Sequence, residues 1–225
     1  MKTGLIGFVV AMEKEAKHLL KEANITNEQT IASKKIFLGK IWGSNFVLIL
    51  SGIGKVNAGM STQLLIDRFS PDIIINFGVA GGKANSGLKA GDIVQVSKVC
   101  QYDYDLSEID NVDIGYMQDY NLTYYPVSVC PNLPYSIAKC ATGDRFTSKQ
   151  MYLDIIKNLG ADIVDMECGA IGQVCYANGV SLQIVKLISD VDGTTESIYE
   201  QYTNNVATIC DKLPKAIKDI LNSLK

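Results

Sequence analysis

The sequence lacks the residue patterns of several common catalytic sites. It has one histidine, His18, so a Ser-His-Asp triad could be built only around that residue, which we interpret as facing solvent. Its six cysteines form no Cys-x-x-Cys motif and have no histidine cluster beside them, which argues against a transition-metal site. Carboxylates without such partners suit only hard ions. We therefore expect no metal and no cofactor, and we interpret the cysteines as free, buried thiols of a cytoplasmic protein.

Long hydrophobic runs and basic stripes are also missing. No stretch reaches about 18 uninterrupted apolar residues, so the sequence does not predict a membrane span. The first apolar run ends at Met12 and is followed by Glu13 instead of a small-residue cleavage site, which favours a buried strand over a signal peptide. The net charge is −3 and the basic residues are scattered, which makes nucleic acid an unexpected partner.

The chain has 225 residues, of which 47% are hydrophobic, enough to bury one large core. We therefore expect one domain spanning residues 1–225. Apolar runs alternate with helical periodicity, which predicts an α/β fold of three layers (α/β/α) with a central mixed, largely parallel sheet. The expected strands are 5–10, 35–42, 45–52, 72–82, 92–99, 137–143, 162–166 and 182–189, and the expected helices are 12–23, 56–69, two that begin near 148 and 168, and one long closing helix at 197–224. Residues 101–135 are interpreted as an excursion from the core.

Acidic residues follow three of the predicted strands. Glu15 comes after the first strand, Glu167 after the run at 162–166, and Asp190 after the last. Ligands gather at the carboxyl ends of strands in such sheets, so we expect these three side chains to lie near one another and near the glycine-rich segment 78–82. The segment 51–55, Ser-Gly-Ile-Gly-Lys, lacks the spacing of a phosphate loop and is interpreted as a tight turn.

Several carboxylates beside a glycine-lined wall match the needs of glycosidic bond cleavage. The oxocarbenium-like transition state requires one group that activates water, one acid that protonates the leaving group, and acceptors for the sugar hydroxyls. Each acid taken singly could instead cap a helix or lie on a solvated face. Their occurrence together favours a catalytic site.

The motifs at these positions resemble those of a known family. GFVVAMEKE, SGIGKVNA, NFGVAGG, GDIV, TGDRF, VDMECGAI and ISD occur in this order and resemble the 5'-methylthioadenosine/S-adenosylhomocysteine nucleosidases, within the purine nucleoside phosphorylase superfamily. The resemblance extends from about Gly4 to the last helix. It implies a cofactor-free N-ribosyl hydrolase that acts on a small nucleoside and forms a homodimer.

The resemblance also implies roles for single residues. Glu15 would be the base that activates water, Asp190 the acid that protonates N7 of adenine, and Glu167 the acceptor for the ribose hydroxyls. Phe146 would stack on the purine, and Thr147 would contact it through its backbone. The predicted substrate contacts are Met12, Ile53, Val79, Ala80, Gly81, Phe146, Thr147, Met166, Glu167, Ser189 and Tyr199.

The proposed acid and base place opposite demands on their surroundings. Asp190 must hold a proton near neutral pH, which requires burial or a neighbouring negative charge to raise its pKa. Glu15 must stay ionised within reach of one water. We therefore expect opposed environments for the two carboxyl groups.

Three positions depart from related sequences and leave alternatives open. Asn76 stands where related phosphorylases have an arginine for phosphate, which favours water as the nucleophile. Val79 replaces a serine usual in the nucleosidases, and Lys186 replaces an arginine usual four residues before the acid. The alternatives are a nucleoside phosphorylase that uses phosphate, and a divergent nucleosidase with an altered substrate or weak catalysis that mainly binds a nucleoside.

Overall fold

One mixed sheet runs through the protein. The structure is a computed structural model that describes residues 4–146 and 148–224. Its strands are β1 (Leu5–Val10), β2 (Asn24–Ile31), β3 (Lys34–Ile41), β4 (Ser44–Leu50), β5 (Ile73–Gly82), β6 (Ile93–Gln101), β7 (Tyr125–Pro126), β8 (Ser136–Thr142), β9 (Ile163–Asp165) and β10 (Ser181–Val191). The order is β10-β6-β8-β9-β5-β1-β4-β3-β2, with β7 beside β6.

Parallel and antiparallel pairs are mixed along the sheet: β6, β8 and β9 are parallel to one another, and β9 is antiparallel to β5. Strand β1 pairs in parallel with β4 and β5, and β5 pairs in parallel with β10. Strands β2, β3 and β4 form an antiparallel meander at one edge. Strand β10 also pairs with β6, so the sequence β10-β6-β8-β9-β5 closes into a ring of paired strands. The expected mixed sheet is confirmed, whereas the ring was not foreseen.

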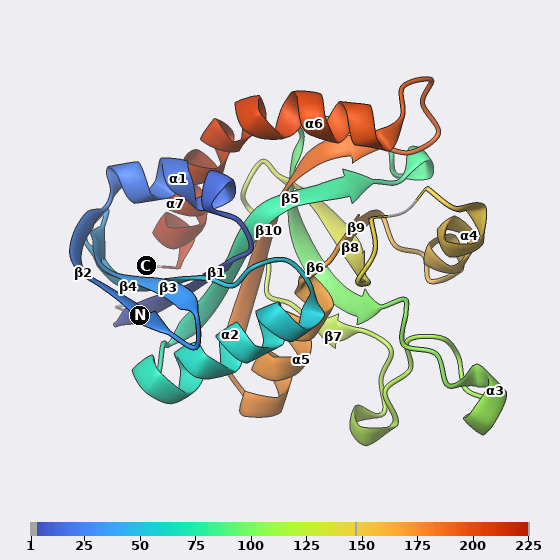
Figure 1. Ribbon diagram of the computed structural model, residues 1–225, viewed down its shortest axis with the longest axis horizontal. Helices are drawn as coiled ribbons and strands as arrows, with labels where there is room; N and C mark the ends of the chain where they lie inside the picture. Colours follow the sequence, from blue (N-terminus) through green and yellow to red (C-terminus); the bar gives the residue numbers. More distant parts are fainter. Residues whose placement is uncertain (1–3, 147, 225) are drawn as a thin grey trace.

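Helices cover both faces of the sheet (Figure 1). They are α1 (Glu13–Glu22), α2 (Lys55–Phe69), α3 (Ser107–Asp110), α4 (Gln150–Asn158), α5 (Cys168–Asn178), α6 (Ile198–Ile209) and α7 (Leu213–Ser223). Helices α1, α6 and α7 lie on one face, and α2 and α5 lie on the other. This arrangement confirms the predicted three layers.

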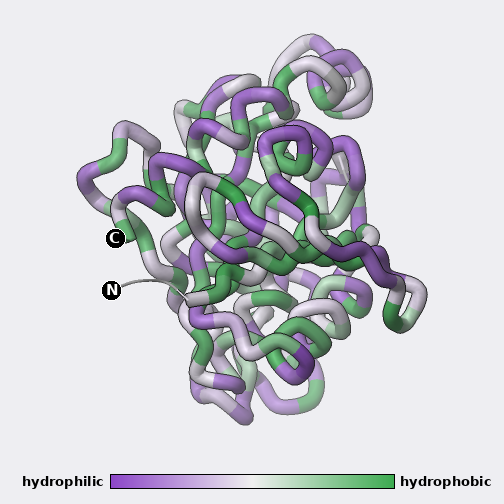
Figure 2. The backbone as a smooth tube through the Cα atoms, turned by 90° about the vertical axis from the view of Figure 1, so that its left-hand side faces the viewer, coloured by the Kyte–Doolittle hydropathy of each residue, from purple (hydrophilic) through white to green (hydrophobic). Residues whose placement is uncertain are grey.

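The β-branched strands supply the two larger hydrophobic cores, one on each face. Alternate residues of β1 divide between them: Val9 packs towards α2 and α5, and Phe8 and Val10 pack towards α1 and α7. Successive side chains of a strand point to opposite faces, so a strand buried on both sides reads as a continuous apolar run. Figure 2 shows these hydrophobic segments in the interior of the molecule.

Three elements differ from the sequence-based expectation. The polar segment Asn24–Ile31 forms the edge strand β2, whose solvent-exposed residues gave no apolar signal. The expected closing helix is two helices, α6 and α7, joined by a 3₁₀ turn at Cys210–Lys212, with Pro214 in the first turn of α7. Within 101–135, Tyr125 is buried in β7 against Tyr120 and Tyr176, so this segment is not wholly an excursion from the core.

The helices and the cysteines of the described residues can be compared with two expectations from the sequence. None of the described helices has the length and apolar character needed to cross a membrane. All six cysteines are buried and unpaired, as expected.

Candidate active site

A cavity of about 360 Å³ opens near the ends of β1, β5, β9 and β10. Every site residue predicted from the sequence lines this cavity except Thr147, which lies outside the described residues. The predicted residues that line it are Met12, Glu15, Ile53, Val79, Ala80, Gly81, Phe146, Met166, Glu167, Ser189, Asp190 and Tyr199. Segments distant in the sequence therefore meet at one place.

Glu15 lies in the first turn of α1 and is only 3% exposed. Its carboxylate accepts hydrogen bonds from the backbone N–H groups of Met12, at 2.9 Å, and Val79, at 2.8 Å. A Cβ atom at Gly78 would lie 2.4 Å from Glu15 Oε1, so this approach requires glycine. Burial raises the pKa of Glu15, while Lys186 and the two N–H donors act in the opposite direction.

Asp190 lies near the end of β10 and is 5% exposed. The Ser189 hydroxyl donates to its Oδ1 atom at 2.6 Å. A Cβ atom at Gly81 would lie 3.0 Å from Oδ2, so the floor of the cavity is closely packed against the carboxyl group. Burial raises the pKa of Asp190, the hydrogen bond from Ser189 lowers it, and the nearby charge of Asp192 raises it further.

The expectation of opposed environments for Glu15 and Asp190 is wrong in one respect. Burial raises the pKa of both groups. The difference lies in the neighbours, because Lys186 and two N–H donors favour the charged form of Glu15, whereas Asp192 disfavours the charged form of Asp190.

Glu167 is the third carboxyl group of the cavity and comes just before α5. It accepts a hydrogen bond from the backbone N–H of Gly54 at 2.9 Å. Burial and the neighbouring charge of Asp165 raise the pKa of Glu167 to about 7, although Lys186 lowers it. Glu167 therefore titrates near neutral pH.

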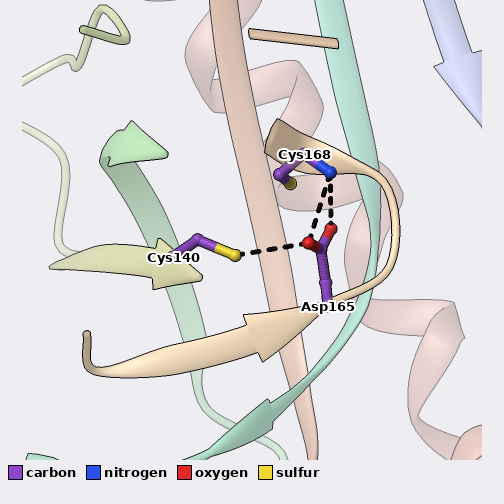
Figure 3. A group of neighbouring side chains, drawn as sticks. All are labelled: Cys140, Asp165 and Cys168. Carbon is purple, nitrogen blue, oxygen red and sulfur yellow. Dashed lines mark hydrogen bonds between the residues drawn. The ribbon is translucent and has the colours of Figure 1, made fainter. Parts of the chain in front are cut away.

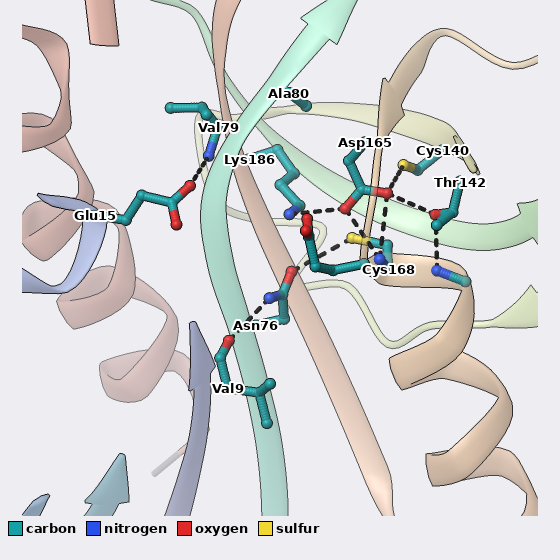
Figure 4. A network of polar contacts seen from close by, with 12 residues as sticks. Val9, Glu15, Asn76, Val79, Ala80, Cys140, Thr142, Asp165, Cys168 and Lys186 are labelled. Atoms are coloured by element: carbon teal, nitrogen blue, oxygen red, sulfur yellow. Dashed lines mark hydrogen bonds and ion pairs between the residues drawn. The ribbon is translucent and has the colours of Figure 1, made fainter. Parts of the chain in front are cut away.

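A buried polar network around Lys186 and Asp165 (Figure 4) lies close enough to Glu15 and Glu167 for the Lys186 charge to lower the pKa of both. Lys186 Nζ pairs with Asp165 Oδ2 at 2.9 Å, and both side chains are almost fully buried. Asp165 also accepts hydrogen bonds from the Thr142 hydroxyl at 2.6 Å and from the Cys168 backbone N–H. Burial alone would lower the pKa of Lys186, but Asp165 and the other nearby acids outweigh it and hold the pKa well above its ordinary value. The ammonium group thus stays charged beneath the cavity.

Cys140, Asp165 and Cys168 lie close enough together to suggest metal ligands (Figure 3). The carboxylate of Asp165 already forms an ion pair with the ammonium group of Lys186, and it accepts a hydrogen bond from Cys140 Sγ at 3.4 Å. Burial raises the pKa of both thiols, which disfavours the thiolates that a metal needs. A metal cation at this place would be repelled by the positive charge of Lys186, so these residues do not fit a metal ion.

The rim of the cavity is aromatic and more exposed than its floor. Phe146 is half exposed and meets the ring of Tyr202 edge to face, with 5.5 Å between centroids. Lys14 on α1 donates to the Tyr202 hydroxyl at 2.9 Å, which links α1 to α6 across the mouth. Tyr199 is largely exposed. The rim thus offers flat apolar surface that a ring could stack on.

Sequence reasoning missed several lining residues: Ala11, Tyr102, Arg145, Val164, Asp165, Ile198 and Tyr202. Most are direct neighbours of predicted residues, and Tyr202 follows Tyr199 by one helical turn, which is a signal that could have found it. Tyr102 had no such signal, because its place depends on the contact between its ring and Gly143.

The cavity provides little for a phosphate dianion. Asn76 is 1% exposed, donates to the Val9 carbonyl at 2.9 Å and accepts from Cys168 Sγ, so it belongs to the interior of the sheet. Arg145 is the sole guanidinium among the described lining residues, and it is stacked on the ring of Tyr152, 4.3 Å from its centroid. Lys186 is already paired with Asp165. This environment favours water over phosphate as the nucleophile.

Comparisons with known proteins agree with this geometry. The model of the Phosphorylase superfamily matches residues 5–222. The chain is 33% identical to the 5'-methylthioadenosine/S-adenosylhomocysteine nucleosidase of Anoxybacillus flavithermus, over 96% of this chain and 99% of that protein. It is 34% identical to the nucleosidase of the same name from Buchnera aphidicola subsp. Acyrthosiphon pisum, over 100% of this chain and 99% of that protein.

A solved structure extends the agreement to the fold. The nucleosidase of this kind from Colwellia psychrerythraea 34H, in complex with adenine, superposes with a TM-score of 0.87 at 27% identity, and the match covers 99% of this chain and 96% of that one. The family inferred from seven short motifs is therefore confirmed. Matched along nearly its whole length by both sequence and structure, the chain belongs to the phosphorylase superfamily and, within it, to the 5'-methylthioadenosine/S-adenosylhomocysteine nucleosidases.

Proposed function

We propose that this protein hydrolyses the N-glycosidic bond of 5'-methylthioadenosine, S-adenosylhomocysteine and related 5'-substituted adenosines, releasing adenine and the free ribose derivative. The observation that carries the proposal is the meeting of two buried carboxyl groups, Glu15 from α1 and Asp190 from β10, at one cavity. Relatives at 33 and 34% identity carry the name of this activity.

Glu15 is proposed as the general base. The two backbone N–H groups fix its carboxylate, and Lys186 beneath it favours the charged form. Burial raises the pKa of Glu15, and these neighbours oppose that rise. A water bound to Glu15 would lose a proton to the carboxylate as it attacks the anomeric carbon.

Asp190 is proposed as the general acid. Adenine is a poor leaving group as an anion, so a proton delivered to N7 lowers the barrier, typically by a factor of about 10²–10⁴ in rate. Burial and the charge of Asp192 favour the protonated carboxyl group that this step requires. The hydroxyl of Ser189 orients it.

The remaining lining residues are proposed to bind the substrate. Glu167 accepts hydrogen bonds from the ribose hydroxyls, beside Met166. Phe146 stacks on the purine, with Thr147 reading its edge through backbone groups, while Met12, Ile53 and Tyr199 border the 5' substituent. The further contacts are proposed at Val79, Ala80, Gly81 and Ser189. An apolar wall suits a thioether tail.

We also propose that residues 1–225 act as one domain and that the protein is a cytoplasmic homodimer that needs no cofactor. Val56 and Ile109 are large apolar residues exposed by 81% and 79%, and Ile53 at the cavity wall is half exposed. Contact with a second copy would remove such side chains from water. Six unpaired cysteines are typical of a reducing compartment.

The test is adenine release in phosphate-free buffer, repeated with phosphate, with the sugar product identified by mass. The proposal predicts equal rates and a free thioribose sugar in both buffers. Release only with phosphate, as a sugar 1-phosphate, would make the protein a phosphorylase. Adenine binding without release would make it a binding protein.

A further inference from the structure

Lys83 and Asp192 form an ion pair that the proposed reaction does not yet use. Lys83 follows β5 and is 5% exposed, and its Nζ atom pairs with Asp192 Oδ2 just beyond the end of β10. The other oxygen of Asp192 accepts a hydrogen bond from the backbone N–H of Ala84. Burying an ammonium group is costly unless it is paired, so this geometry is specific and not a chance surface contact.

The pair lies next to Asp190 in the strand register. Asp190 is opposite Gly81 and Val191 is opposite Gly82, and the Asp192 N–H then donates to the Gly82 carbonyl at 3.2 Å. The Lys83–Asp192 contact thus continues the pairing of β5 with β10 past its last residues. It ties together the two segments that form the floor of the cavity.

Helix α6 holds the same segment from the other side. The side-chain amide of Gln201 accepts from the Val191 N–H and donates to the Val191 carbonyl, both at 3.0 Å. The Asn205 side chain donates to the Ser189 carbonyl at 2.8 Å. The residues on either side of Asp190 are therefore fixed by α6, while Asp192 is fixed by Lys83 alone among side chains of the described residues.

We propose that Lys83 and Asp192 are positioning residues for Asp190: their ion pair fixes the segment after β10 on the segment after β5 and so holds the Asp190 carboxyl group at the cavity floor. This inference rests on the proposed role of Asp190 as the acid. The pair also brings two opposite charges to the segments next to Asp190. Removing either partner leaves the other charge uncompensated.

The two charges act on the Asp190 proton in opposite directions. An uncompensated Asp192 favours protonated Asp190, and an uncompensated Lys83 favours ionised Asp190. The other titratable or charged groups around the cavity are Glu15 on α1, Tyr102 after β6, Arg145 after β8, Asp165 at the end of β9, Glu167 after it, Lys186 on β10, and Tyr199 and Tyr202 on α6. Among the described residues, none of these groups is a hydrogen-bond or ion-pair partner of Lys83 or Asp192.

The experiment measures single-turnover adenine release from 5'-methylthioadenosine as a function of pH. The upper limb of the profile reports deprotonation of the acid. Lys83→Met should move this limb to higher pH and Asp192→Asn to lower pH, each by on the order of one pH unit, as expected for one uncompensated unit charge on the segment next to the acid. The double variant should return the limb towards its wild-type position, with a lower rate because the tie is lost.

Controls separate this role from simple destabilisation. Lys83→Arg keeps the charge and should keep the limb, and Lys215→Met, which breaks the exposed pair with Asp219 on α7, should leave the whole profile unchanged. Circular dichroism checks folding, and Asp192→Asn alone suffices if Lys83→Met does not fold.

Two results would overturn the inference in distinguishable ways. The first result is an inactive Asp190→Asn variant together with an upper limb that stays in place, or moves in the same direction, in both single variants of the pair. It would reject the positioning role of the pair and leave the role of Asp190 as the acid intact. Activity retained in Asp190→Asn would reject the acid itself and the pair with it.

Discussion

The two sides of the cavity treat their carboxyl groups differently. On the α1 side, Glu15 accepts hydrogen bonds from two backbone N–H groups, and the buried ammonium group of Lys186 lowers its pKa. On the β10 side, Asp190 accepts one hydrogen bond, from the Ser189 hydroxyl, and the negative charge of Asp192 raises its pKa. Both groups are almost fully buried. Burial alone would make both carboxyl groups poor ions, so the neighbours, and not the depth, distinguish the proposed base from the proposed acid.

The largest effect should come from the β10 side. Asp190→Asn keeps the shape and can still accept a hydrogen bond from Ser189, but it has no acidic proton to deliver. We expect the rate of adenine release to fall by about 10²–10⁴-fold. Adenine binding, measured by calorimetry, should be nearly unchanged, and near wild-type turnover would refute the assigned acid.

The buried charge under the α1 side should matter next, through stability. Lys186→Met leaves Asp165 buried without its ion pair, and breaking such a pair costs about 3–5 kcal/mol in free energy of unfolding. Urea denaturation measures this cost. Lys215→Met, at an exposed pair, is the matched control and should change the stability little. A similar, small loss in both variants would show that the buried lysine is not needed.

A smaller effect should follow from crowding Glu15 without altering its charge. In Gly78→Ala the new Cβ would lie 2.4 Å from Glu15 Oε1, so the carboxylate must move. A displacement of this kind should lower the rate about 10–100-fold, because catalytic geometry is sensitive to shifts of about 1 Å. The matched control is Gly59→Ala in α2, where the nearest atom is 3.8 Å away; it should retain full activity. Equal activity in the two variants would contradict the placement of Glu15.

The smallest effect concerns Glu167 and pH. Its pKa is raised to about 7, so the wild-type carboxyl group loses its proton as the pH rises through neutrality. If the ionised form accepts the ribose hydroxyls, KM should fall several-fold as the pH rises from about 6 to about 8. In Glu167→Gln this pH dependence of KM should disappear. A wild-type KM that is flat over the range would argue against the role.

The raised pKa of Glu167 also predicts how the free energy of unfolding changes with pH. Because the pKa of Glu167 is higher in the folded state than the ordinary value, the folded protein binds more protons than the unfolded chain between about pH 4.5 and 7. The contribution of Glu167 to the free energy of unfolding is therefore present at low pH and lost as the pH rises through this window. Thermal melts of Glu167→Gln against wild type across this range would show the difference.

The sequence predicted the parts of the fold that depend on local apolar pattern. Buried strands such as Ile73–Gly82 can be recognised in the sequence by their runs of β-branched residues. The polar strand Asn24–Ile31 did not, because it is stabilised by pairing with β3 and not by burial. The ring closure between β10 and β6 is a long-range pairing with no local signature.

The candidate site divides in the same way. Residues that directly follow strands, such as Glu15 and Asp190, could be placed at one edge from the sequence. The Lys83–Asp192 pair could not, since its partners are 109 residues apart and neither lies in a recognised motif. The raised pKa of Glu15 was also missed, because burial of a side chain in the first turn of a helix depends on the strand that packs over it.

The division of labour between Glu15 and Asp190 is tested most directly by changing the leaving group. Hydrolysis of a 4-nitrophenyl 5-methylthioriboside releases 4-nitrophenolate, which is a stable anion, so the reaction needs an activated water but no proton from an acid. The assignment predicts that Asp190→Asn retains most of its kcat/KM on this substrate although it fails on 5'-methylthioadenosine, while Glu15→Gln fails on both. Loss of both reactions in Asp190→Asn, or survival of the nitrophenyl reaction in Glu15→Gln, would contradict the assignment of acid and base.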